Sequence, residues 1–474
     1  MTVLPLASLQ ARWRAGDRAW LIGGSAERLL DVAQRERDRL RASERILLVE
    51  SDPVQLLAIF IASVERGCNV FLGSPQWRES EWQQAIALVV PNWIYRKGDR
   101  VPSPSLATNV PTPLATFPAI GIPTGGSSGQ LRFALHDWQT LTAAAQGFQT
   151  YFGGGPVRAF CTLPLYHVSG LMQFVRVLNA GGQLAIASYK SLHFDMHTGA
   201  LIAEPELVNI ARDLFFISLV PTQLQRLMAA GGSRWLAGFG TVLLGGAPAW
   251  NELLAAARSE SIRLAPTYGM TETASQVATL KPEDFLAGRT SSGCVLPHAR
   301  VTIRGADGEL LPPLQVGTIA IAAESLCWGY LPGNAIAREF LTDDVGYVDD
   351  DGQLVIVGRR SRKIVTGGEN VTPEEIEAVI RSVPQIRDVC VVGIPDREWG
   401  EVVAAVVVLS APAADTLPTD WVALVKAELR DRLSSFKQPK VWIACNSFPR
   451  NDRGKTDCAR VREFAIAQYR RQCR

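Results

Sequence analysis

Short apolar runs and longer amphipathic stretches alternate along the first part of the chain. Ile46–Glu50 is an apolar run of strand length. Asp52 and Pro53 then open an apolar stretch that reaches Val64, and these two residues suit the N-cap and the first position of a helix. Asn69–Leu72 is again a run of strand length. This strand–helix–strand order predicts a parallel sheet covered by helices.

The same alternation continues to about residue 300, beyond a Pro-rich connection at residues 101–123. Four further strands are expected there, at residues 159–163, 183–187, 215–220 and 241–244. From Val301 the runs become short and alternating, and the pairs Asp307-Gly308 and Asp351-Gly352 predict hairpin turns. We therefore expect a β-rich subregion between residues 301 and 358.

A smaller unit is predicted after residue 358. Its expected elements are a helix from Pro373, strands at Val389–Val392 and Val402–Leu409, and a helix from Asp420. Thr372 and Glu375 have the spacing of a capping box at the start of the first helix. The predicted fold class is α/β, with a large N-terminal α/β body and a small α+β C-terminal domain.

Composition narrows the classes of function. Of the 474 residues, 47% are hydrophobic and 20% are charged, which excludes a chain that is disordered throughout. The net charge is only +2, and we expect no nucleic-acid partner because proteins that coat nucleic acid carry a clear basic excess. The eight cysteines show no C-x-x-C spacing and no Cys/His cluster, which favours scattered reduced thiols. No apolar stretch reaches about 18 residues and the N-terminus lacks a basic start, so we expect a soluble cytoplasmic protein without a membrane span.

A Gly-rich segment carries the first candidate chemistry. It consists of Thr124, Gly125, Gly126, Ser127, Ser128 and Gly129, followed by Arg132. Glycines let the backbone bring N–H groups close to an anion, and the hydroxyl groups and the arginine add further donors. Such a loop suits a polyphosphate, although it lacks the lysine of a P-loop. Taken alone, a flexible linker is the alternative.

A second motif follows the strand predicted at 241–244. The sequence Gly245-Gly246-Ala247-Pro248 predicts a flat floor on which an adenine or an acyl group could lie. Tyr268 offers a ring for stacking, and Thr271 and Glu272 offer oxygen ligands for Mg²⁺. Taken alone, Glu272 could equally be a carboxylate at the N-terminus of a helix.

Two further motifs hold charged residues in the C-terminal third. Asp344 supplies a carboxylate suited to the two hydroxyls of a ribose, and Arg359 supplies a cation suited to phosphate. An ordinary hairpin explains the same residues without a ligand. Lys455 follows Gly454 on a polar turn, where a solvated lysine is the simpler interpretation.

In this order the four motifs resemble those of the adenylate-forming superfamily of acyl-CoA synthetases, adenylation domains and luciferases, over residues 120–460. Leu163–Leu171, Tyr268–Leu280, Gly358–Lys363 and Gly367–Val371 are similar to segments of the o-succinylbenzoate–CoA ligases of menaquinone and phylloquinone biosynthesis. The resemblance implies that Mg·ATP activates o-succinylbenzoate to an acyl-adenylate, with release of pyrophosphate, and that CoA then forms the thioester. It also implies an N-terminal adenylation domain (1–358), a hinge (359–361) and a mobile C-terminal lid domain (362–474).

The resemblance assigns nucleotide-binding roles to the motif residues. The β- and γ-phosphates would lie in the loop of residues 124–132, the adenine against Gly246, Ala247 and Tyr268, and the ribose on Asp344 beside Arg359. Glu272 would bind magnesium, and Thr271 would touch the α-phosphate. Lys455 would bridge the reacting carboxylate and the α-phosphate, where a positioned cation stabilises developing negative charge.

The resemblance also implies an acyl pocket and a CoA site. His167 would line the acyl pocket and rearrange between the two steps, and the alternative is a core histidine. Polar groups for a substrate with two carboxylates and a ketone would come from Ser169, Thr271, Ser275 and Gln276. Gly367 and Gly368 would border the pantetheine tunnel of CoA.

Some alternatives remain open from the sequence. The family's Thr-Gly-Asp stands here as Thr342-Asp343-Asp344, so Asp343 is an alternative to Asp344 as the ribose carboxylate. The rival functions are a CoA ligase for another aryl or short acyl acid, an adenylating enzyme that loads a carrier protein, and a nucleotide-binding scaffold without catalysis. The joint presence of Glu272, Asp344, Arg359 and Lys455 favours an enzyme over a scaffold. Homo-oligomer formation is left open.

Overall fold

The chain divides into two compact units in the computed structural model. The structure describes residues 4–77, 79–103, 117–125, 131–195, 198–366, 369–396, 399–410, 421–430, 432–433, 435–450 and 455–472. Unit 1 comprises Met1–Ala247, Ala257–Val301 and Ala320–Phe340. Unit 2 comprises Pro248–Ala256, Thr302–Ile319 and Leu341–Arg474.

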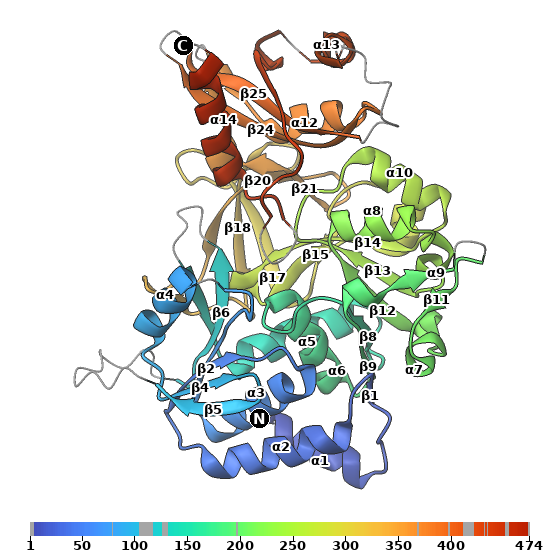
Figure 1. The fold of residues 1–474 in the computed structure, drawn as a ribbon, viewed down its shortest axis with the longest axis vertical. Coiled ribbons are helices and arrows are strands. Elements are labelled where there is room, and N and C mark those ends of the chain that lie inside the picture. The colour runs from blue at the N-terminus through green and yellow to red at the C-terminus, as the bar shows by residue number, and fades with distance from the viewer. Residues whose placement is uncertain are drawn as a thin grey trace. The chain divides into compact units, whose positions relative to one another are not determined.

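Unit 1 is built on two sheets (Figure 1). In the described part of the chain, the first sheet has the strand order β19-β7-β6-β3-β2-β4-β5, and the second has the order β1-β9-β8-β12-β13-β14-β15-β16. The central pairs of both sheets are parallel, and antiparallel pairs lie toward the edges. The predicted parallel α/β architecture is therefore confirmed.

The strands of the first sheet are β2 (Arg45–Val49), β3 (Asn69–Leu72), β4 (Trp93–Arg96), β5 (Asp99–Pro102), β6 (Ile120–Gly125), β7 (Leu131–His136) and β19 (Gly329–Leu331). The strands of the second sheet are β1 (Leu21–Ile22), β8 (Arg158–Cys161), β9 (Leu184–Ile186), β12 (Phe215–Leu219), β13 (Thr241–Leu244), β14 (Leu264–Met270), β15 (Ser275–Thr279) and β16 (Cys294–Val295). A separate two-stranded ladder joins β10 (His193–Phe194) and β11 (Leu201–Ile202).

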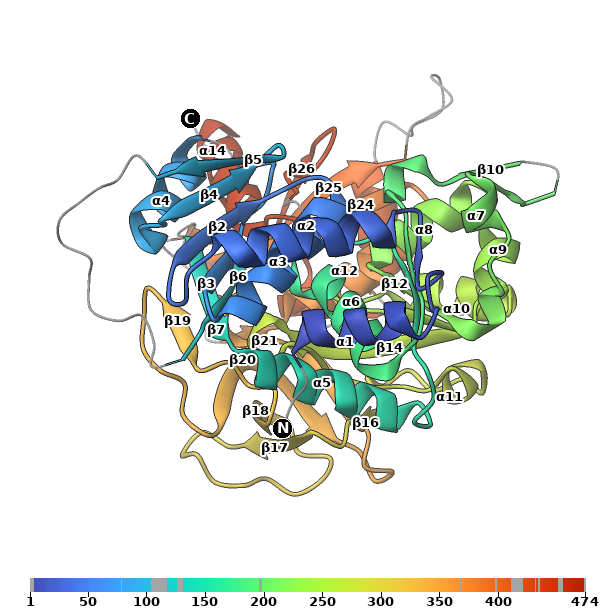
Figure 2. The same cartoon turned by 90° about the horizontal axis from the view of Figure 1, so that it is seen from below.

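Three helices, α3 (Pro53–Arg66), α5 (Trp138–Tyr151) and α6 (Val168–Ala180), pack between the two sheets in one core (Figure 2). Phe60 of α3 and Phe174 of α6 belong to the same buried cluster as Ile46 and Ala159 of the two sheets. Helix α3 begins as predicted, because the Asp52 carboxylate accepts a hydrogen bond from the N–H of Val54 at 2.9 Å. Burial on all sides explains why this helix has an apolar sequence on every face.

The remaining helices cover the outer faces or lie in connections. They are α1 (Pro5–Arg14), α2 (Ala26–Arg39), α4 (Glu79–Val89), α7 (Pro205–Val208), α8 (Pro221–Ala229), α9 (Ser233–Ala237) and α11 (Pro282–Leu286). Most of α10 (Asn251–Ser259) belongs to unit 2. Side chains of α4 close a second core on the other face of the first sheet, where Phe71 and Phe133 meet edge to face.

A five-stranded sheet forms the C-terminal part of unit 2. Its strands are β22 (Ile364–Thr366), β23 (Glu369–Val371), β24 (Ile386–Asp396), β25 (Gly400–Leu409) and β26 (Val441–Ala444). Helices α12 (Pro373–Arg381) and α13 (Trp421–Arg430) share a core with one face, and α14 (Cys458–Gln472) shares a core with the other. The small α+β unit that the sequence predicts is therefore confirmed.

A four-stranded sheet, with the order β17-β18-β20-β21, precedes the five-stranded sheet in the sequence. Its strands are β17 (Ala299–Arg304), β18 (Gly317–Ala323), β20 (Phe340–Val348) and β21 (Leu354–Arg359). The predicted hairpin turn at Asp351-Gly352 joins β20 to β21, and Gly352 has a φ of 75°, which a residue without a Cβ adopts readily. The β-rich subregion is confirmed, whereas the boundary at 358 and the hinge at 359–361 stay predictions.

The predicted capping box at the start of α12 is wrong. The Thr372 side chain forms no capping hydrogen bond. The Glu375 carboxylate instead accepts from the Lys437 ammonium group at 2.7 Å, and this ion pair competes with the backbone for the carboxylate. No helix in the described ranges is long and apolar enough to cross a bilayer.

Candidate active site

The predicted phosphate loop joins two antiparallel strands of unit 1. Thr124 and Gly125 end β6, and Arg132 lies opposite Thr124 at the start of β7. The four residues between them that were predicted to bind phosphate, Gly126, Ser127, Ser128 and Gly129, lie outside the described residues. The strand pairing therefore places Thr124 and Arg132 at the two ends of the loop.

The Glu272 carboxylate lies beside these two residues. It belongs to the short 3₁₀ turn Thr271–Thr273, which directly follows β14. Glu272 Oε1 accepts hydrogen bonds from the Tyr330 hydroxyl at 3.0 Å and from the Thr124 hydroxyl at 3.4 Å. The Arg132 guanidinium lies 4.4 Å from the centre of the Tyr330 ring. The predicted residues Thr124, Arg132 and Glu272 are thus brought together.

Tyr330 was not predicted as a site residue. Burial, and then the negative charge of Glu272, raise the pKa of Tyr330, so the phenol stays protonated and acts as a donor to the carboxylate. Its position depends on the pairing of β19 with β7, in which Tyr330 lies opposite Ala134. Nothing in the local sequence marks this contact, because the two strands are about 200 positions apart.

The chemistry of this cluster fits a magnesium ion. Magnesium prefers oxygen ligands and keeps several waters or substrate phosphates in its shell. Glu272 Oε2 has no hydrogen-bond donor among the described residues. No cluster of three or more His, Cys, Asp or Glu side chains that could hold a metal occurs there either. An ion at Glu272 would therefore complete its shell with phosphate oxygens and water.

A buried histidine fixes the backbone beside Glu272. His136 ends β7, and its Nε2 lies 2.8 Å from the carbonyl oxygen of Thr271. Its Nδ1 lies 3.1 Å from the Thr140 hydroxyl. Burial lowers the pKa of His136 to about 4, so the ring is neutral at pH 7 and Nε2–H donates to the carbonyl. His136 is a second residue that the sequence analysis missed, and it ties the predicted α-phosphate contact Thr271 to the strand that follows the loop.

The predicted adenine floor lies where two parallel strands end. Gly246 and Ala247 follow β13 and are exposed, and Tyr268 lies near the end of the neighbouring β14. A Cβ at Gly245 would lie 2.4 Å from the Thr267 hydroxyl oxygen, so this position has no room for a side chain. Ligands of α/β sheets bind beyond such carboxyl ends, and the adenine-binding role of these residues stays a prediction.

Two of the predicted acyl-pocket residues, Ser275 and Gln276, contact a buried arginine. Arg176 Nη2 donates to the Ser275 hydroxyl at 2.8 Å and to the Gln276 side-chain oxygen at 3.2 Å. The Arg176 side chain is 4% exposed, and its guanidinium lies 4.2 Å from the centre of the Phe148 ring. His167 and Ser169 lie at the start of the same helix, α6.

Arg176 carries a positive charge that no acidic side chain of the described residues pairs with. Burial lowers its pKa to about 9, so the guanidinium remains a cation at pH 7. His298 is 7% exposed, and neither of its ring nitrogens has a hydrogen-bond partner among the described residues. Burial, and then the charge of Arg176, lower the pKa of His298 to about 4. The sequence analysis missed Arg176, although a lone charge in the apolar stretch of α6 was a usable signal.

Unit 2 pairs two of the predicted nucleotide-binding residues. Arg359 Nε lies 2.9 Å from Asp344 Oδ1, and the Asp344 side chain is 9% exposed. The alternative, Asp343, is more exposed and accepts from the backbone N–H of Ser361 at 3.1 Å. Asp344 stays the predicted ribose carboxylate, with Asp343 as the alternative. Lys455 is partly buried in unit 2, whereas Gly367 and Gly368 lie outside the described residues.

Two family matches agree with this arrangement. Residues 34–331 match the AMP-binding enzyme family, and residues 375–455 match the AMP-binding enzyme C-terminal domain. The chain belongs to the AMP-binding enzyme family. The first match contains the phosphate loop, the Glu272 cluster and Arg176, and the second contains Lys455.

Curated proteins that are similar to this chain are named 2-succinylbenzoate–CoA ligase. The 2-succinylbenzoate–CoA ligase of Listeria monocytogenes is 35% identical over 309 residues, which are 64% of this chain and 60% of that protein. The 2-succinylbenzoate–CoA ligase of Enterococcus faecalis is 33% identical over 339 residues, which are 70% of this chain and 66% of that protein. The chain therefore spans less than two thirds of the length of these relatives.

Solved structures show the same fold over nearly the whole chain. The o-succinylbenzoate CoA synthetase (MenE) of Bacillus subtilis, in complex with the acyl-adenylate intermediate OSB-AMP, matches with a TM-score of 0.81 at 22% identity, covering 97% of this chain and 98% of that one. ATP-bound MatB from Rhodopseudomonas palustris matches with a TM-score of 0.79 at 22% identity, covering 99% and 100%. The predicted fold of this AMP-binding enzyme is thereby confirmed.

Proposed function

We propose that this AMP-binding enzyme is a 2-succinylbenzoate–CoA ligase of menaquinone or phylloquinone biosynthesis. It would use ATP, Mg²⁺ and CoA, in the cytoplasm, to convert o-succinylbenzoate to its CoA thioester. The observation that carries the substrate assignment is the buried cation of Arg176, held by Ser275 and Gln276. The relatives named 2-succinylbenzoate–CoA ligase support the same assignment.

The charge of Arg176 fits a substrate with two carboxylates. One carboxylate of o-succinylbenzoate reacts with ATP, and the other must be bound elsewhere while keeping its charge. A buried guanidinium without an acidic partner is costly unless a ligand supplies the anion. A fatty-acyl chain would instead require apolar contacts at the position where Arg176, Ser275 and Gln276 lie. We assign Arg176 to the carboxylate that does not react.

The first half-reaction follows from the proposed roles. An oxygen of the reacting carboxylate attacks the α-phosphorus of ATP, a new P–O bond forms, and the bond to pyrophosphate breaks. Lys455 would hold the carboxylate and the α-phosphate together and stabilise the charge on their oxygens. Magnesium at Glu272 would neutralise phosphate charge. The Tyr330 and Thr124 hydroxyls orient the Glu272 carboxylate.

The second half-reaction replaces AMP by CoA. The thiol of CoA loses its proton to solvent, its sulfur attacks the acyl carbon, the C–S bond forms, and AMP leaves with the electrons of the C–O bond. We propose that the C-terminal lid domain, residues 362–474, turns about the hinge 359–361 between the two steps, with Gly367 and Gly368 at the CoA tunnel. Lys455 would then have no role in the second step, and His167 would rearrange to admit CoA.

A substrate panel tests the proposal directly. Pyrophosphate release is measured with Mg·ATP, CoA and a series of acids that includes o-succinylbenzoate, 4-oxo-4-phenylbutanoate, benzoate and a short fatty acid. We expect strong preference for o-succinylbenzoate and the appearance of its CoA thioester. Glu272→Gln serves as the inactive control. Preference for another aryl or acyl acid would keep the mechanism and discard this substrate, and pyrophosphate release without a CoA product would favour loading of a carrier protein.

A further inference from the structure

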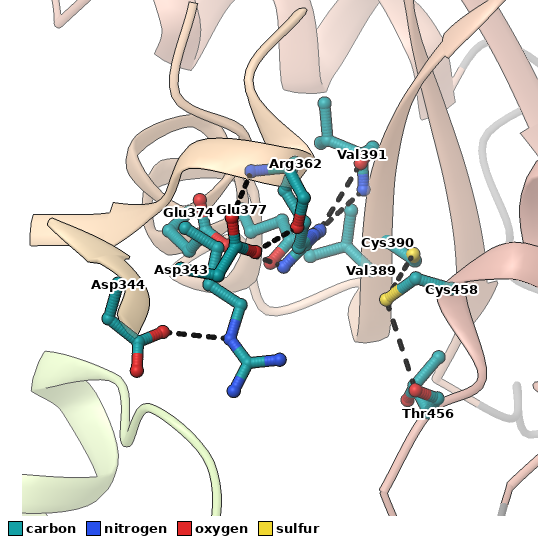
Figure 3. A network of polar contacts seen from close by, with 12 residues as sticks. Asp343, Asp344, Arg362, Glu374, Glu377, Val389, Cys390, Val391, Thr456 and Cys458 are labelled. Atoms are coloured by element: carbon teal, nitrogen blue, oxygen red, sulfur yellow. Dashed lines mark hydrogen bonds and ion pairs between the residues drawn. The ribbon is translucent and has the colours of Figure 1, made fainter. Parts of the chain in front are cut away.

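Two cysteines of unit 2 lie in direct contact although they are far apart in the sequence. Cys390 is on β24 and Cys458 is the first residue of α14, and their sulfur atoms are 3.5 Å apart (Figure 3). Cys390 is 1% exposed, whereas Cys458 is partly exposed. A small oxidant can therefore reach the thiol of Cys458, whereas the thiol of Cys390 is buried beside it.

The surroundings of the pair favour a thiolate on Cys458. The hydrogen bond from Cys390 is the largest cause of the lowered pKa of Cys458; burial opposes it, and the charge of Arg362 supports it. The N-terminal position on α14 acts in the same direction. The same contact, together with burial, raises the pKa of Cys390, so that this thiol keeps its proton.

Other acidic and basic groups around the pair are largely satisfied by one another. Arg362 binds Glu374 at 2.8 Å and Glu377 at 2.5 Å, and Glu377 also accepts from the backbone N–H of Val391 at 2.8 Å (Figure 3). The two carboxylates partly oppose the effect of Arg362 on Cys458. By contrast, burial raises the pKa of Cys161 to about 12, which makes that thiol unreactive.

Two described residues that flank Lys455 in the sequence contact β24. Arg450, five positions before Lys455, forms an ion pair with Asp388 of β24. Cys458, three positions after Lys455, contacts Cys390, two positions further along the same strand. A change in the sulfur–sulfur distance therefore acts on one of the two contacts with β24 that flank Lys455 in the sequence.

We propose that Cys390 and Cys458 form a peroxide-reactive dithiol whose oxidation to a disulfide slows adenylate formation. The Cys458 thiolate attacks the O–O bond of a hydroperoxide, an S–O bond forms, and the leaving oxygen takes up a proton. The sulfur of Cys390 then attacks the sulfenic acid, the S–S bond forms, and water leaves with the S–O oxygen. Two thiols thus lose two electrons, which reduce one hydroperoxide to water and the corresponding alcohol, or to two waters for hydrogen peroxide.

The expected effect on activity follows from the distances. A disulfide requires about 2.05 Å between the sulfur atoms, so closure of the 3.5 Å contact moves them together by about 1.5 Å. Misplacement of a reacting group by about 1 Å can lower a rate about 100-fold. We expect a loss of about 10- to 100-fold in adenylate formation. This consequence rests on the proposed function, because it requires Lys455 to act in the first half-reaction, whereas the dithiol itself does not.

The test uses the full chain, treated with hydrogen peroxide, cleared with catalase, and compared before and after reduction with dithiothreitol. Peptide mass spectrometry identifies the linked cysteines without reference to activity. Pyrophosphate release reports the first half-reaction, and conversion of supplied acyl-adenylate and CoA to thioester reports the second. Cys458→Ser and Cys390→Ser remove the pair, and Cys445→Ser is the matched control in the same unit.

We expect a Cys390–Cys458 disulfide in the wild type and in Cys445→Ser, and a reversible slowing of the first half-reaction alone. Both cysteine variants of the pair should keep their rates under peroxide. A linkage between other cysteines, or oxidation of Cys458 without a disulfide, would overturn the dithiol. Equal slowing of both half-reactions would overturn the link to Lys455. If the disulfide forms in a chain that adenylates no acid in the panel, the proposed function fails while the dithiol stands.

Discussion

Replacement of Arg176 by glutamine should lower the activity toward substrates that carry a second carboxylate more than toward substrates that lack it. Arg176→Gln removes the buried cation and keeps a side chain that can still bind Ser275 and Gln276. We expect kcat/KM for o-succinylbenzoate to fall strongly, because the carboxylate that does not react loses its counter-charge. The loss should appear mainly in KM, since this carboxylate is bound in the same way before and during the reaction.

The magnitude follows from the burial of the arginine. Truncating one partner of a buried, hydrogen-bonded charge pair costs about 2–5 kcal/mol. Taking about 3 kcal/mol, with a factor of ten for each 1.4 kcal/mol, gives a decrease of about 150-fold in kcat/KM. The same variant should unfold at a temperature at least as high as the wild type, because burial already disfavours the charged form of Arg176 in the free protein.

The assay compares two acids that differ by a single group. Initial rates of pyrophosphate release are measured for o-succinylbenzoate and for 4-oxo-4-phenylbutanoate, which lacks the aromatic carboxylate, with wild type, Arg176→Gln and Arg176→Lys. The large loss should be confined to o-succinylbenzoate, and lysine should restore part of it. An equal loss for both acids would refute the assignment, because Arg176 would then support the fold of the pocket rather than the charge of the substrate.

Three further variants probe the other proposed roles. Lys455→Ala should lower pyrophosphate release by about 10³-fold and leave the conversion of supplied acyl-adenylate to thioester within about twofold; equal losses would contradict a role in the first step alone. Tyr330→Phe removes one donor to Glu272, so we expect about a 10-fold lower kcat/KM for Mg·ATP and a higher requirement for Mg²⁺, and an unchanged magnesium titration would count against this orientation. The pKa of His298, about 4 in the folded chain, lies below its ordinary value of 6.5, so the unfolded chain binds the proton first on acidification. The free energy of unfolding should therefore fall by about 3 kcal/mol more in the wild type than in His298→Phe between pH 7 and pH 4, as measured by urea denaturation; parallel pH curves would show that His298 is not held neutral.

The sequence predicted those helices and strands that are marked by their own residues, such as an apolar run or an N-cap. The strand Asn69–Leu72 has the bounds that its apolar run predicts, and α3 begins at Pro53 behind its Asp52 cap. The capping box at Thr372 failed because the partner that competes for Glu375, Lys437, is 62 positions away. Sequence spacing reports what neighbouring residues are able to do, and tertiary contacts decide which of these interactions form.

The residues of the candidate site also differ in whether local sequence or distant contacts reveal them. The residues Thr124, Arg132 and Glu272 were predicted because each lies in a contiguous motif that resembles a known family. Tyr330 was missed because its contact with Glu272 depends on a strand pair that closes over about 200 positions. The contact between Arg176 and Ser275 was missed for a related reason, since the two residues are 99 positions apart, although the lone charge in α6 was itself a local signal.

The buried charges of the molecule differ in how they are neutralised, and this difference indicates where a ligand belongs. Asp344 has the guanidinium of Arg359 at 2.9 Å, and Arg362 has the carboxylates of Glu374 and Glu377. These charges are satisfied by the chain itself, and removing one partner would leave the other uncompensated. Arg176 has only neutral oxygen partners among the described residues, so the chain supplies its hydrogen bonds but leaves its charge to be balanced from outside. An anionic ligand would stabilise this position more than any of the paired ones, which is why the second carboxylate of the substrate is assigned there and not to the charged residues of unit 2.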